Sequence, residues 1–350
     1  MIIYKTCMRF TCSRTNEETG PQIKVCLWKS HRDSLSIIVN HMVTDGQGIK
    51  QCAYLLADIY SKIIRNKEYV PDYIIDGDRG FKKIISGIPF MDKVKILLFN
   101  KKENNQSNNH KFPLCSEEEK SPLILTHEIS SEMYDAIRNF CKNNKVTVND
   151  VILTAYFRVV SNMLQLRGQT LSVPIMIDMR RYLEDKSFYT LTNFTSTAAI
   201  SIAVNPGEDF CKTLGKVKLD INSKKNNHLG MNGFLKLDML FGILKDNLSY
   251  KILKKSLKNP KISMTNIGVL DSNKLVFEGC NIENAFVTGS IKRYPCFQLS
   301  VSSFKNKMTF CVNLYGSQQD YDIISSFFNN MDNELKEIPS ISVIKNNSAI

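Results

Sequence analysis

The order of strand-like and helix-like segments is the feature that most constrains how this chain folds. Apolar and polar residues alternate from Ile23 to Trp28 and again from Leu35 to Val39, which predicts a β-hairpin. Directly after it, apolar residues fall on one helical stripe between Ile49 and Ile63, which predicts a helix. Because strands and helices then follow without strict alternation, the sequence predicts an α+β fold of layered sheets and helices.

The same patterns divide the rest of the chain into further elements. Strands are expected at residues 123–129, 171–178, 194–204, 262–266 and 282–287, with a hairpin at 297–304 and 308–315. Helices are expected at residues 131–143, 151–166, 208–225, 234–258 and 321–336. Ser130 or Ser131 would cap the first of these helices, and Thr147 with Asp150 predicts a capping box on the second.

A polar run at Lys101–Lys111 (KKENNQSNNHK) is interpreted as an exposed linker. A chain of 350 residues is long for one compact core and suits two packed subdomains. The linker therefore separates a unit at residues 1–112 from a unit at residues 113–350.

Composition and charge narrow the class of protein. The net charge of +12 comes largely from dispersed lysines, and no aromatic residues interleave with a basic stripe, so no nucleic-acid partner is expected. No apolar run reaches about 18 residues, and Lys5 interrupts the start before a secretory signal can form. Ten cysteines without a C-x-x-C pair or metal-ligand spacing favour reduced thiols in a cytoplasmic protein that holds no metal.

The segment with the clearest chemistry is His41-Met-Val-Thr-Asp45-Gly46, on the loop between the second strand and the helix. In acyl transfer to an alcohol or amine the acceptor is the nucleophile, and it must lose a proton as it attacks. A histidine, with an ordinary pKa near ~6.5, can take that proton near neutral pH. A buried Asp45 must be paired and can brace the loop against an arginine. Gly46 permits a tight turn beside the ring.

Other motif interpretations of this chain are weaker. Gly46-Gln-Gly48 imitates a dinucleotide-binding loop, but Gln51 occupies its third glycine position. The sequence has no G-x-S-x-G elbow and no P-loop, which disfavours a serine hydrolase and a nucleotide triphosphatase. Asp76–Gly80 is interpreted as a turn, because the glutamate of a calcium loop is missing.

The motif resembles the H-x-x-x-D-G signature of the chloramphenicol-acetyltransferase-like superfamily, which includes condensation domains and alcohol acetyltransferases. Four further segments resemble that superfamily in the same order. They are residues 146–151 (VTVNDV), 173–182 (VPIMIDMRRY), 193–197 (NFTST) and 263–268 (SMTNIG). A single short motif is weak, whereas five matches in order over roughly residues 20 to 320 are specific.

The resemblance implies two lobes with mixed sheets and flanking helices, joined across a tunnel. It implies His41 as general base, Asp45 as a structural partner of Arg180, and Arg181 as the second choice of partner. Asn193 and Thr195 would lie near the cleft and donate hydrogen bonds to the oxyanion. The donor would be acyl-CoA or the acyl-phosphopantetheine arm of a carrier protein, the acceptor a small alcohol or amine, and no cofactor would stay bound.

Two departures from the superfamily pattern shape the expected function. Asn40 replaces the first histidine of condensation domains, which favours alcohol or amine acylation, as in alcohol acetyltransferases, over peptide-bond condensation. Only 40 residues precede His41, so the N-terminal lobe is expected to be incomplete and the chain truncated. Two alternatives therefore stay open: carrier-protein-dependent amide formation, and an inactive truncated paralogue that acts as a binding module.

Residues 91–100 (MDKVKILLFN) are basic and apolar. Such a segment is compatible with a contact to a membrane surface, as in lipid-acylating members of the superfamily. We expect a buried or lobe-bridging helix instead.

Overall fold

The computed structural model describes residues 9–16, 18–73, 80–103, 110–116, 120–183, 191–244, 246–256 and 259–338. Within these ranges, β1 (Ile23–Trp28) and β2 (Ser34–Val39) form an antiparallel hairpin, as the alternating pattern predicted. A six-stranded sheet has the order β3-β8-β7-β6-β4-β5. Its strands are β3 (Ser121–Ile129), β4 (Thr170–Asp178), β5 (Thr195–Ala203), β6 (Ile262–Leu270), β7 (Phe297–Phe304) and β8 (Lys307–Gly316).

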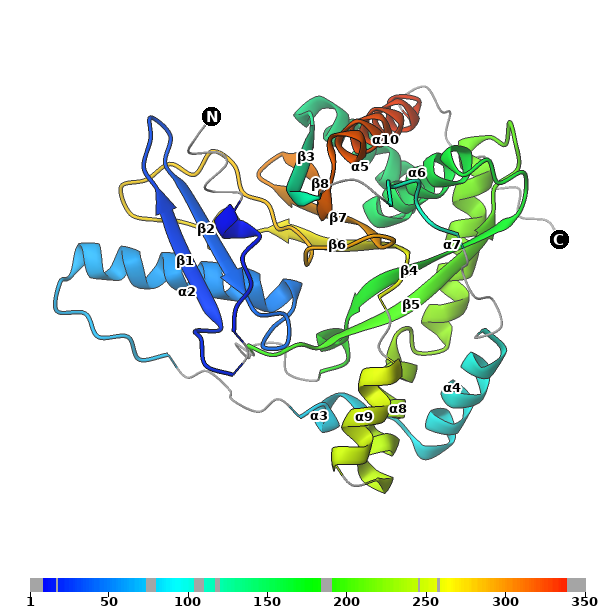
Figure 1. Cartoon of the computed structure of the whole chain (residues 1–350), viewed down its shortest axis with the longest axis horizontal. Helices are drawn as coiled ribbons and strands as arrows, with labels where there is room; N and C mark the ends of the chain where they lie inside the picture. Colours follow the sequence, from blue (N-terminus) through cyan, green and yellow to red (C-terminus); the bar gives the residue numbers. More distant parts are fainter. Residues whose placement is uncertain are drawn as a thin grey trace.

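The large sheet is mixed, and helices cover one of its faces (Figure 1). β6 pairs in parallel with β4 and β7, whereas the other neighbouring strands pair antiparallel. The covering helices are α5 (Ser131–Asn144), α6 (Val148–Met163), α7 (Phe210–Asn226) and α10 (Gln318–Lys336). Phe297 on β7, Phe327 on α10 and Phe112 pack ring against ring in the core between them. The predicted α+β class is confirmed.

Local sequence signals set the starts of these helices. The Ser130 hydroxyl accepts a hydrogen bond from the Met133 N–H at the start of α5. Thr147 and Asp150 form the predicted capping box of α6, in which each side chain accepts from the other's backbone N–H. Each cap satisfies a backbone donor that the helix itself leaves unpaired.

A buried ion pair fixes the start of α7 against the sheet. The Glu208 side chain is 1% exposed and accepts hydrogen bonds from Lys216 Nζ at 2.6 Å and Thr213 Oγ1 at 2.9 Å. Burial alone would raise the pKa of Glu208, but the hydrogen bonds from Lys216 and Thr213 hold it below its ordinary value.

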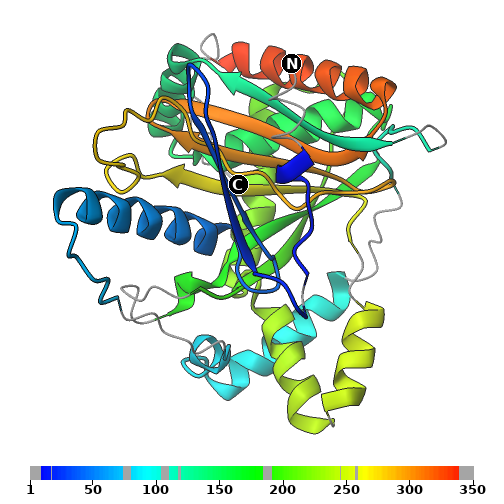
Figure 2. The ribbon, with the colours of Figure 1, turned by 60° about the vertical axis from the view of Figure 1, so that its left-hand side comes forward.

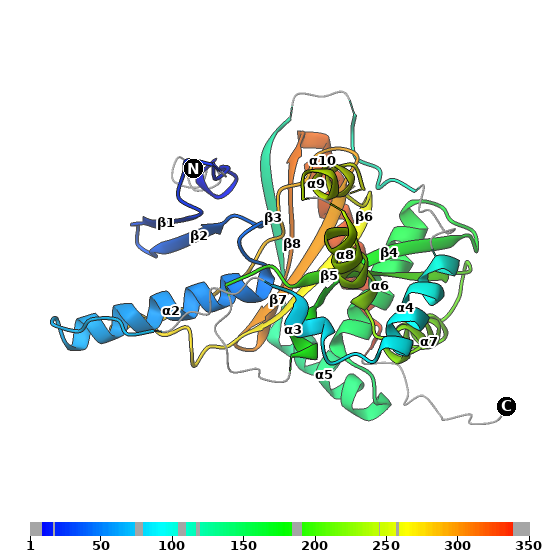
Figure 3. The same ribbon diagram turned by 90° about the horizontal axis from the view of Figure 1, so that it is seen from below.

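The hairpin and α2 (Gly46–Arg65) lie together on one side of the six-stranded sheet (Figure 3). Ala57 of α2 packs with Leu270, Leu275 and Phe304 in a small second core. Ser61 Oγ donates to the Val276 carbonyl at 2.9 Å. The chain between β6 and β7 therefore attaches α2 to the large sheet. An incomplete N-terminal lobe stays a prediction.

Four further helices gather at one end of the molecule (Figures 1 and 2). They are α3 (Lys82–Ile85), α4 (Phe90–Glu103), α8 (Met231–Ile243) and α9 (Asp246–Ser256). Ile84 and Ile96 belong to the same core as the large sheet. The division of the chain at residue 112 stays a prediction. Part of the predicted linker is helical, because α4 continues to Glu103, and its residues 104–109 lie outside the described ranges.

Two predicted elements are wrong. Residues 282–287 are not a strand. At its end the segment passes alongside β7, where the N–H groups of Val287 and Gly289 donate to the hydroxyls of Ser302 and Ser300 instead of to a backbone ladder. The single helix predicted at 234–258 is divided into α8 and α9. The Ser249 hydroxyl of α9 donates to carbonyls at the end of α8, which stabilises the break.

Candidate active site

Asn40 builds the loop that carries the H-x-x-x-D-G motif. Its Oδ1 accepts from the Met42 N–H at 2.9 Å, and its Nδ2 donates to Gln22 Oε1 at 2.7 Å. Its carbonyl accepts from the N–H groups of Val43 and Thr44. An asparagine at this position therefore folds the loop by the turn chemistry that its side chain favours.

The His41 ring is fixed in one tautomer by its own loop. Nδ1 lies 3.0 Å from the Thr44 carbonyl oxygen, which can only accept a hydrogen bond. Nδ1 must then carry the hydrogen, which leaves the lone pair on Nε2. His41 lies at the exposed end of the loop. The ring can accept a proton from a group that approaches from solvent.

Asn193 attaches the motif loop to the beginning of β5. Its Nδ2 donates to the His41 carbonyl at 2.8 Å, and its Oδ1 accepts from the Thr195 N–H at 3.0 Å. The structure therefore brings Asn193 to the motif, where its amide holds the His41 backbone, and Thr195 contacts Asn193 through its own N–H. Their role as oxyanion donors stays a prediction.

The Asp45 carboxylate joins the start of α2 to Phe194 and Arg180, and we call this set of contacts the clamp. The side chain is 1% exposed, and Oδ1 accepts from the N–H groups of Gln47 at 3.1 Å and Gly48 at 3.0 Å as the N-cap of α2. Oδ2 accepts from the Phe194 N–H at 2.8 Å. Arg180 Nη1 lies 2.8 Å from Oδ2 and 3.0 Å from Oδ1, so the predicted partners are in contact.

Arg180 is itself held by several groups. It belongs to the short helix η1 (Met179–Tyr182), donates from Nη2 to the Thr192 carbonyl at 2.7 Å, and lies 3.1 Å from Asp178 Oδ1. Arg181, the second choice of partner, is exposed and lies over the Tyr182 ring at 5.7 Å. The guanidinium of Arg180 therefore joins the motif loop to the end of β4.

Small residues and a buried lysine seat α2 on β6. A Cβ at Gly46 would lie 2.8 Å from Ile267 Cδ1, and one at Gly48 would lie 1.6 Å from Thr44 Oγ1. Lys50 is 8% exposed, and its Nζ donates to the Ile267 carbonyl at 2.9 Å. Burial lowers the pKa of Lys50, although the nearby carboxylates of Asp178 and Asp45 partly offset this effect.

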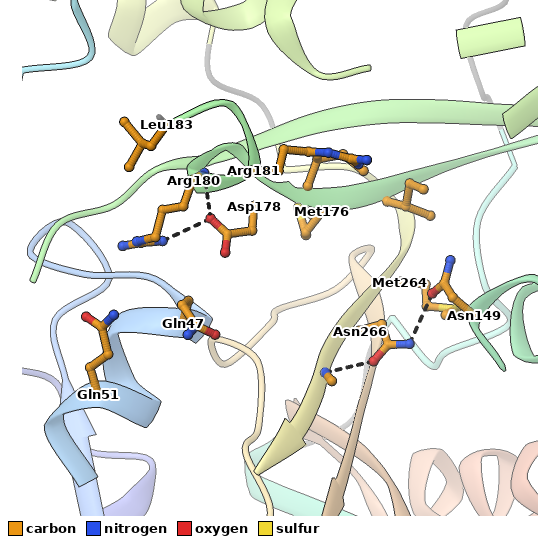
Figure 4. A pocket seen from close by; sticks show the side chains of 13 residues that line it. Gln47, Gln51, Asn149, Met176, Asp178, Arg180, Arg181, Leu183, Met264 and Asn266 are labelled. Carbon is orange, nitrogen blue, oxygen red and sulfur yellow. Dashed lines mark hydrogen bonds and ion pairs between the residues drawn. The ribbon is translucent and has the colours of Figure 1, made fainter. Parts of the chain in front are cut away.

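A pocket of about 610 Å³ opens beside the clamp, between α2, the end of β4, β6 and the start of α6 (Figure 4). On the wall of the pocket formed by β6 and α6, Asn266 Nδ2 donates to Asn149 Oδ1 at 3.1 Å. Among the described residues, His41 is not one of its lining side chains. The lining residues are Gln47, Gln51, Asn149, Ile175, Met176, Ile177, Asp178, Arg180, Arg181, Leu183, Met264, Asn266 and Gly268.

Sequence reasoning missed several residues of this site. Asn149 and Asn266 lie within two segments that resemble the superfamily, so a signal for them was present. Lys50 and Gln51 lie on α2 without any motif, and no local pattern distinguishes them from solvent-facing residues. Gly48 does carry a signal, because the Gly46-Gln-Gly48 spacing is typical of a dinucleotide-binding loop, but that signal does not indicate its contact with Thr44.

The described ranges also bear on metal and membrane binding. Within the described ranges, no group of three or more His, Cys, Asp or Glu side chains is placed to hold a metal ion. The nine cysteines in those ranges are free. No helix of the described chain combines the length and apolar character needed to cross a bilayer.

Known structures resemble this chain over nearly its whole length, although no family model and no curated protein matches its sequence. The epimerization domain from the third module of tyrocidine synthetase B has a TM-score of 0.64 and 15% identity, over 96% of this chain and 77% of that one. The first condensation domain of the calcium-dependent antibiotic synthetase has a TM-score of 0.66 and 11% identity, over 96% and 75%. Trichothecene 15-O-acetyltransferase from Fusarium sporotrichioides has a TM-score of 0.63 and 13% identity, over 96% and 74%.

These similarities define the class of fold. The chain has the fold of condensation domains and of chloramphenicol-acetyltransferase-like acetyltransferases, as the order of its motifs predicted. At 11–15% identity across these neighbours, the likeness establishes the fold alone.

Proposed function

We propose that this protein is an acyltransferase that moves an acyl group from a thioester to an alcohol or amine, with His41 as general base. The observation that carries the proposal is the state of the His41 ring. Its Nδ1 is engaged by the Thr44 carbonyl, so the basic Nε2 is left on an exposed loop. The fold neighbours include an acetyltransferase and a condensation domain, which supports transfer chemistry of this general kind.

The proposed reaction needs one base and a site for negative charge. The acceptor's proton moves to His41 Nε2 while the acceptor's lone pair attacks the thioester carbonyl carbon. The C–S bond then breaks, and the departing thiolate takes the same proton from His41. The ring thus returns to its starting state, and no covalent enzyme intermediate is required.

Negative charge develops on the carbonyl oxygen during the attack. We assign its stabilisation to the Thr195 hydroxyl and to the Asn193 amide hydrogen that His41 does not use. Of the backbone N–H groups around Gly46, those of Gln47 and Gly48 already donate to Asp45. Fixed donors of this kind lower the barrier because they need no reorganisation. The Asn193 amide donates to the His41 carbonyl, which supports this role for Asn193.

The substrates follow from the same chemistry. The donor is acyl-CoA or the acyl-phosphopantetheine arm of a carrier protein, and the protein acts in the cytoplasm. The pocket beside the clamp holds part of one substrate. Its carboxamides, from Gln47, Gln51, Asn149 and Asn266, suit a ligand with hydrogen-bonding groups along an apolar body.

A second candidate is carrier-protein-dependent amide formation. The likeness to the condensation domain of an antibiotic synthetase favours it. Products formed from free acyl-CoA, or with an alcohol acceptor, support the first candidate. Products formed only from an acyl carrier protein and an amine support the second.

The test is a panel of acyl-CoA and acyl-carrier donors with alcohol and amine acceptors, in which products are identified by mass spectrometry. His41→Ala should lower turnover by about 10²–10⁴-fold while folding is retained. His31→Ala, at an exposed histidine in the hairpin turn, is the matched control and should act like the unchanged protein. Near-normal turnover by His41→Ala would refute the assignment.

A further inference from the structure

Three helices at one end of the molecule expose an unusual amount of apolar surface. On α4, α8 and α9 nine large apolar side chains are exposed, among the residues whose side chains are described. They are Phe90, Met91, Leu98, Met239, Phe241, Ile243, Leu248, Tyr250 and Ile252. On α5, α6, α7 and α10 together only Leu219 and Tyr321 are exposed in this way. We call the nine residues the apolar end.

The first helix of the apolar end, α4, is anchored in the main core. On α4, Ile96 is buried in the main core, whereas Phe90, Met91 and Leu98 on the opposite side are 77%, 64% and 62% exposed. At 100° per residue these three fall within a 100° arc of the helix, so they form one face. α4 is therefore anchored by one side and presents large apolar groups on the other.

α8 has apolar residues on all sides of its axis. A helix with that composition is normally surrounded by protein or by lipid. Met231 and Phe234 meet this expectation because they are buried, but Ile243 at its end is 74% exposed. Tyr250 on α9 is 57% exposed and lies on the helix that Ser249 fastens to the end of α8. No described part of the chain covers these exposed apolar side chains.

The charge around the apolar end indicates what covers it. The fully exposed charged residues described on α3, α4, α8 and α9 are all lysines: Lys82, Lys83, Lys95, Lys236 and Lys251. Lys95 pairs with Asp92 at 3.1 Å, and the Asp92 side chain is 36% exposed. The cores of protein interfaces are depleted in lysine. Apolar side chains bordered by lysines instead suit the boundary of an anionic bilayer, where the rings insert and the ammonium groups meet the headgroups.

We propose that α3, α4, α8 and α9 form a docking surface for the face of an anionic membrane. Through this surface the protein lies on the membrane without crossing the bilayer. The surface is separate from the clamp around Asp45. Residues 91–98, part of the segment expected from sequence to be buried or to bridge the lobes, are buried on one side only. The proposal does not depend on acyl transfer.

The test is co-sedimentation of the full chain with vesicles of phosphatidylcholine, with or without phosphatidylserine, at low and high salt. The chain should bind the anionic vesicles and release them at high salt. The triple variant Phe90→Ser/Met91→Ser/Leu98→Ser should bind on the order of 100-fold more weakly, since each buried apolar side chain contributes up to about tenfold. The matched control Leu219→Ser/Tyr321→Ser should bind like the unchanged protein.

A second variant guards against misfolding of the first. Lys95→Glu/Lys251→Glu keeps the apolar side chains and should lose the preference for phosphatidylserine. The proposal is overturned if the chain binds no vesicles, or if both variants, shown to be folded by circular dichroism, bind as the unchanged protein does. It is also overturned if light scattering shows a stable oligomer that the triple variant dissolves, because the apolar end would then be a protein interface.

Discussion

Replacing Asp45 by Asn tests whether the clamp is structural. The carboxylate accepts from three backbone N–H groups and from Arg180, with its side chain 1% exposed. An amide of the same shape turns one acceptor oxygen into an NH₂ group that faces donors. It also leaves the Arg180 guanidinium, whose side chain is 11% exposed, without its buried counter-charge. Breaking one partner of such a pair costs about 3–5 kcal/mol.

That cost is a large fraction of the roughly 5–15 kcal/mol that stabilises an ordinary domain. Urea unfolding followed by the fluorescence of Trp28, the single tryptophan, should therefore show a clear drop in midpoint for Asp45→Asn. Asp33→Asn, at an exposed turn, is the control and should change little. In a double-mutant cycle with Arg180→Met, the two changes should couple by more than about 1 kcal/mol. An unchanged midpoint with abolished turnover would show that Asp45 acts in the chemistry instead.

Two further predictions follow from the packing. Gly48→Ala should destabilise the fold and lower activity more than Gly46→Ala. A Cβ at Gly48 would lie 1.6 Å from the Thr44 side chain, whereas a Cβ at Gly46 would lie 2.8 Å from the flexible end of an isoleucine. Unfolding midpoints of both variants should show a loss of about 1–3 kcal/mol for Gly48→Ala, and equal losses for the two variants would contradict this reasoning. Glu208→Gln should cost about 1–3 kcal/mol at neutral pH. Because the folded-state pKa of Glu208 lies below the ordinary 4.5, that stabilisation is present above pH 4.5 and is lost as the pH falls through the folded-state value, which unfolding curves at stepped pH will show against the exposed control Glu283→Gln.

Sequence reasoning succeeded where local physics decides the outcome. The alternating hairpin strands and the capping box at Thr147 depend on residues two to four positions apart, and each is present as expected. The prediction of a strand at 282–287 was wrong because it depends on distant parts of the chain. Its residues have strand-like composition, but the ladder positions beside β7 are taken by β6 and β8. A local pattern cannot show that both sides of β7 are already paired.

The break between α8 and α9 failed differently. The apolar run from residue 234 onward looks like one long helix, but the Ser249 hydroxyl bonds to carbonyls up to nine residues earlier. Serine competes with the backbone for such bonds, and tertiary packing determines whether the helix continues or turns back. The exposed lysines around this end carried no signal either, because lysine is common along the whole chain.

The tautomer of the His41 ring and the position of that ring depend on residues in different parts of the chain. The tautomer of His41 is set by the carbonyl of Thr44, three residues away, so the motif itself determines which ring nitrogen is basic. The position of the ring is set elsewhere, because Asn193 and Phe194 bind the loop from 152 and 149 residues along the chain. A short motif can therefore predict which atom is basic. It cannot predict what that atom faces, since residues on β4, β5 and β6 decide how the loop is held and which side chains line the pocket beside it.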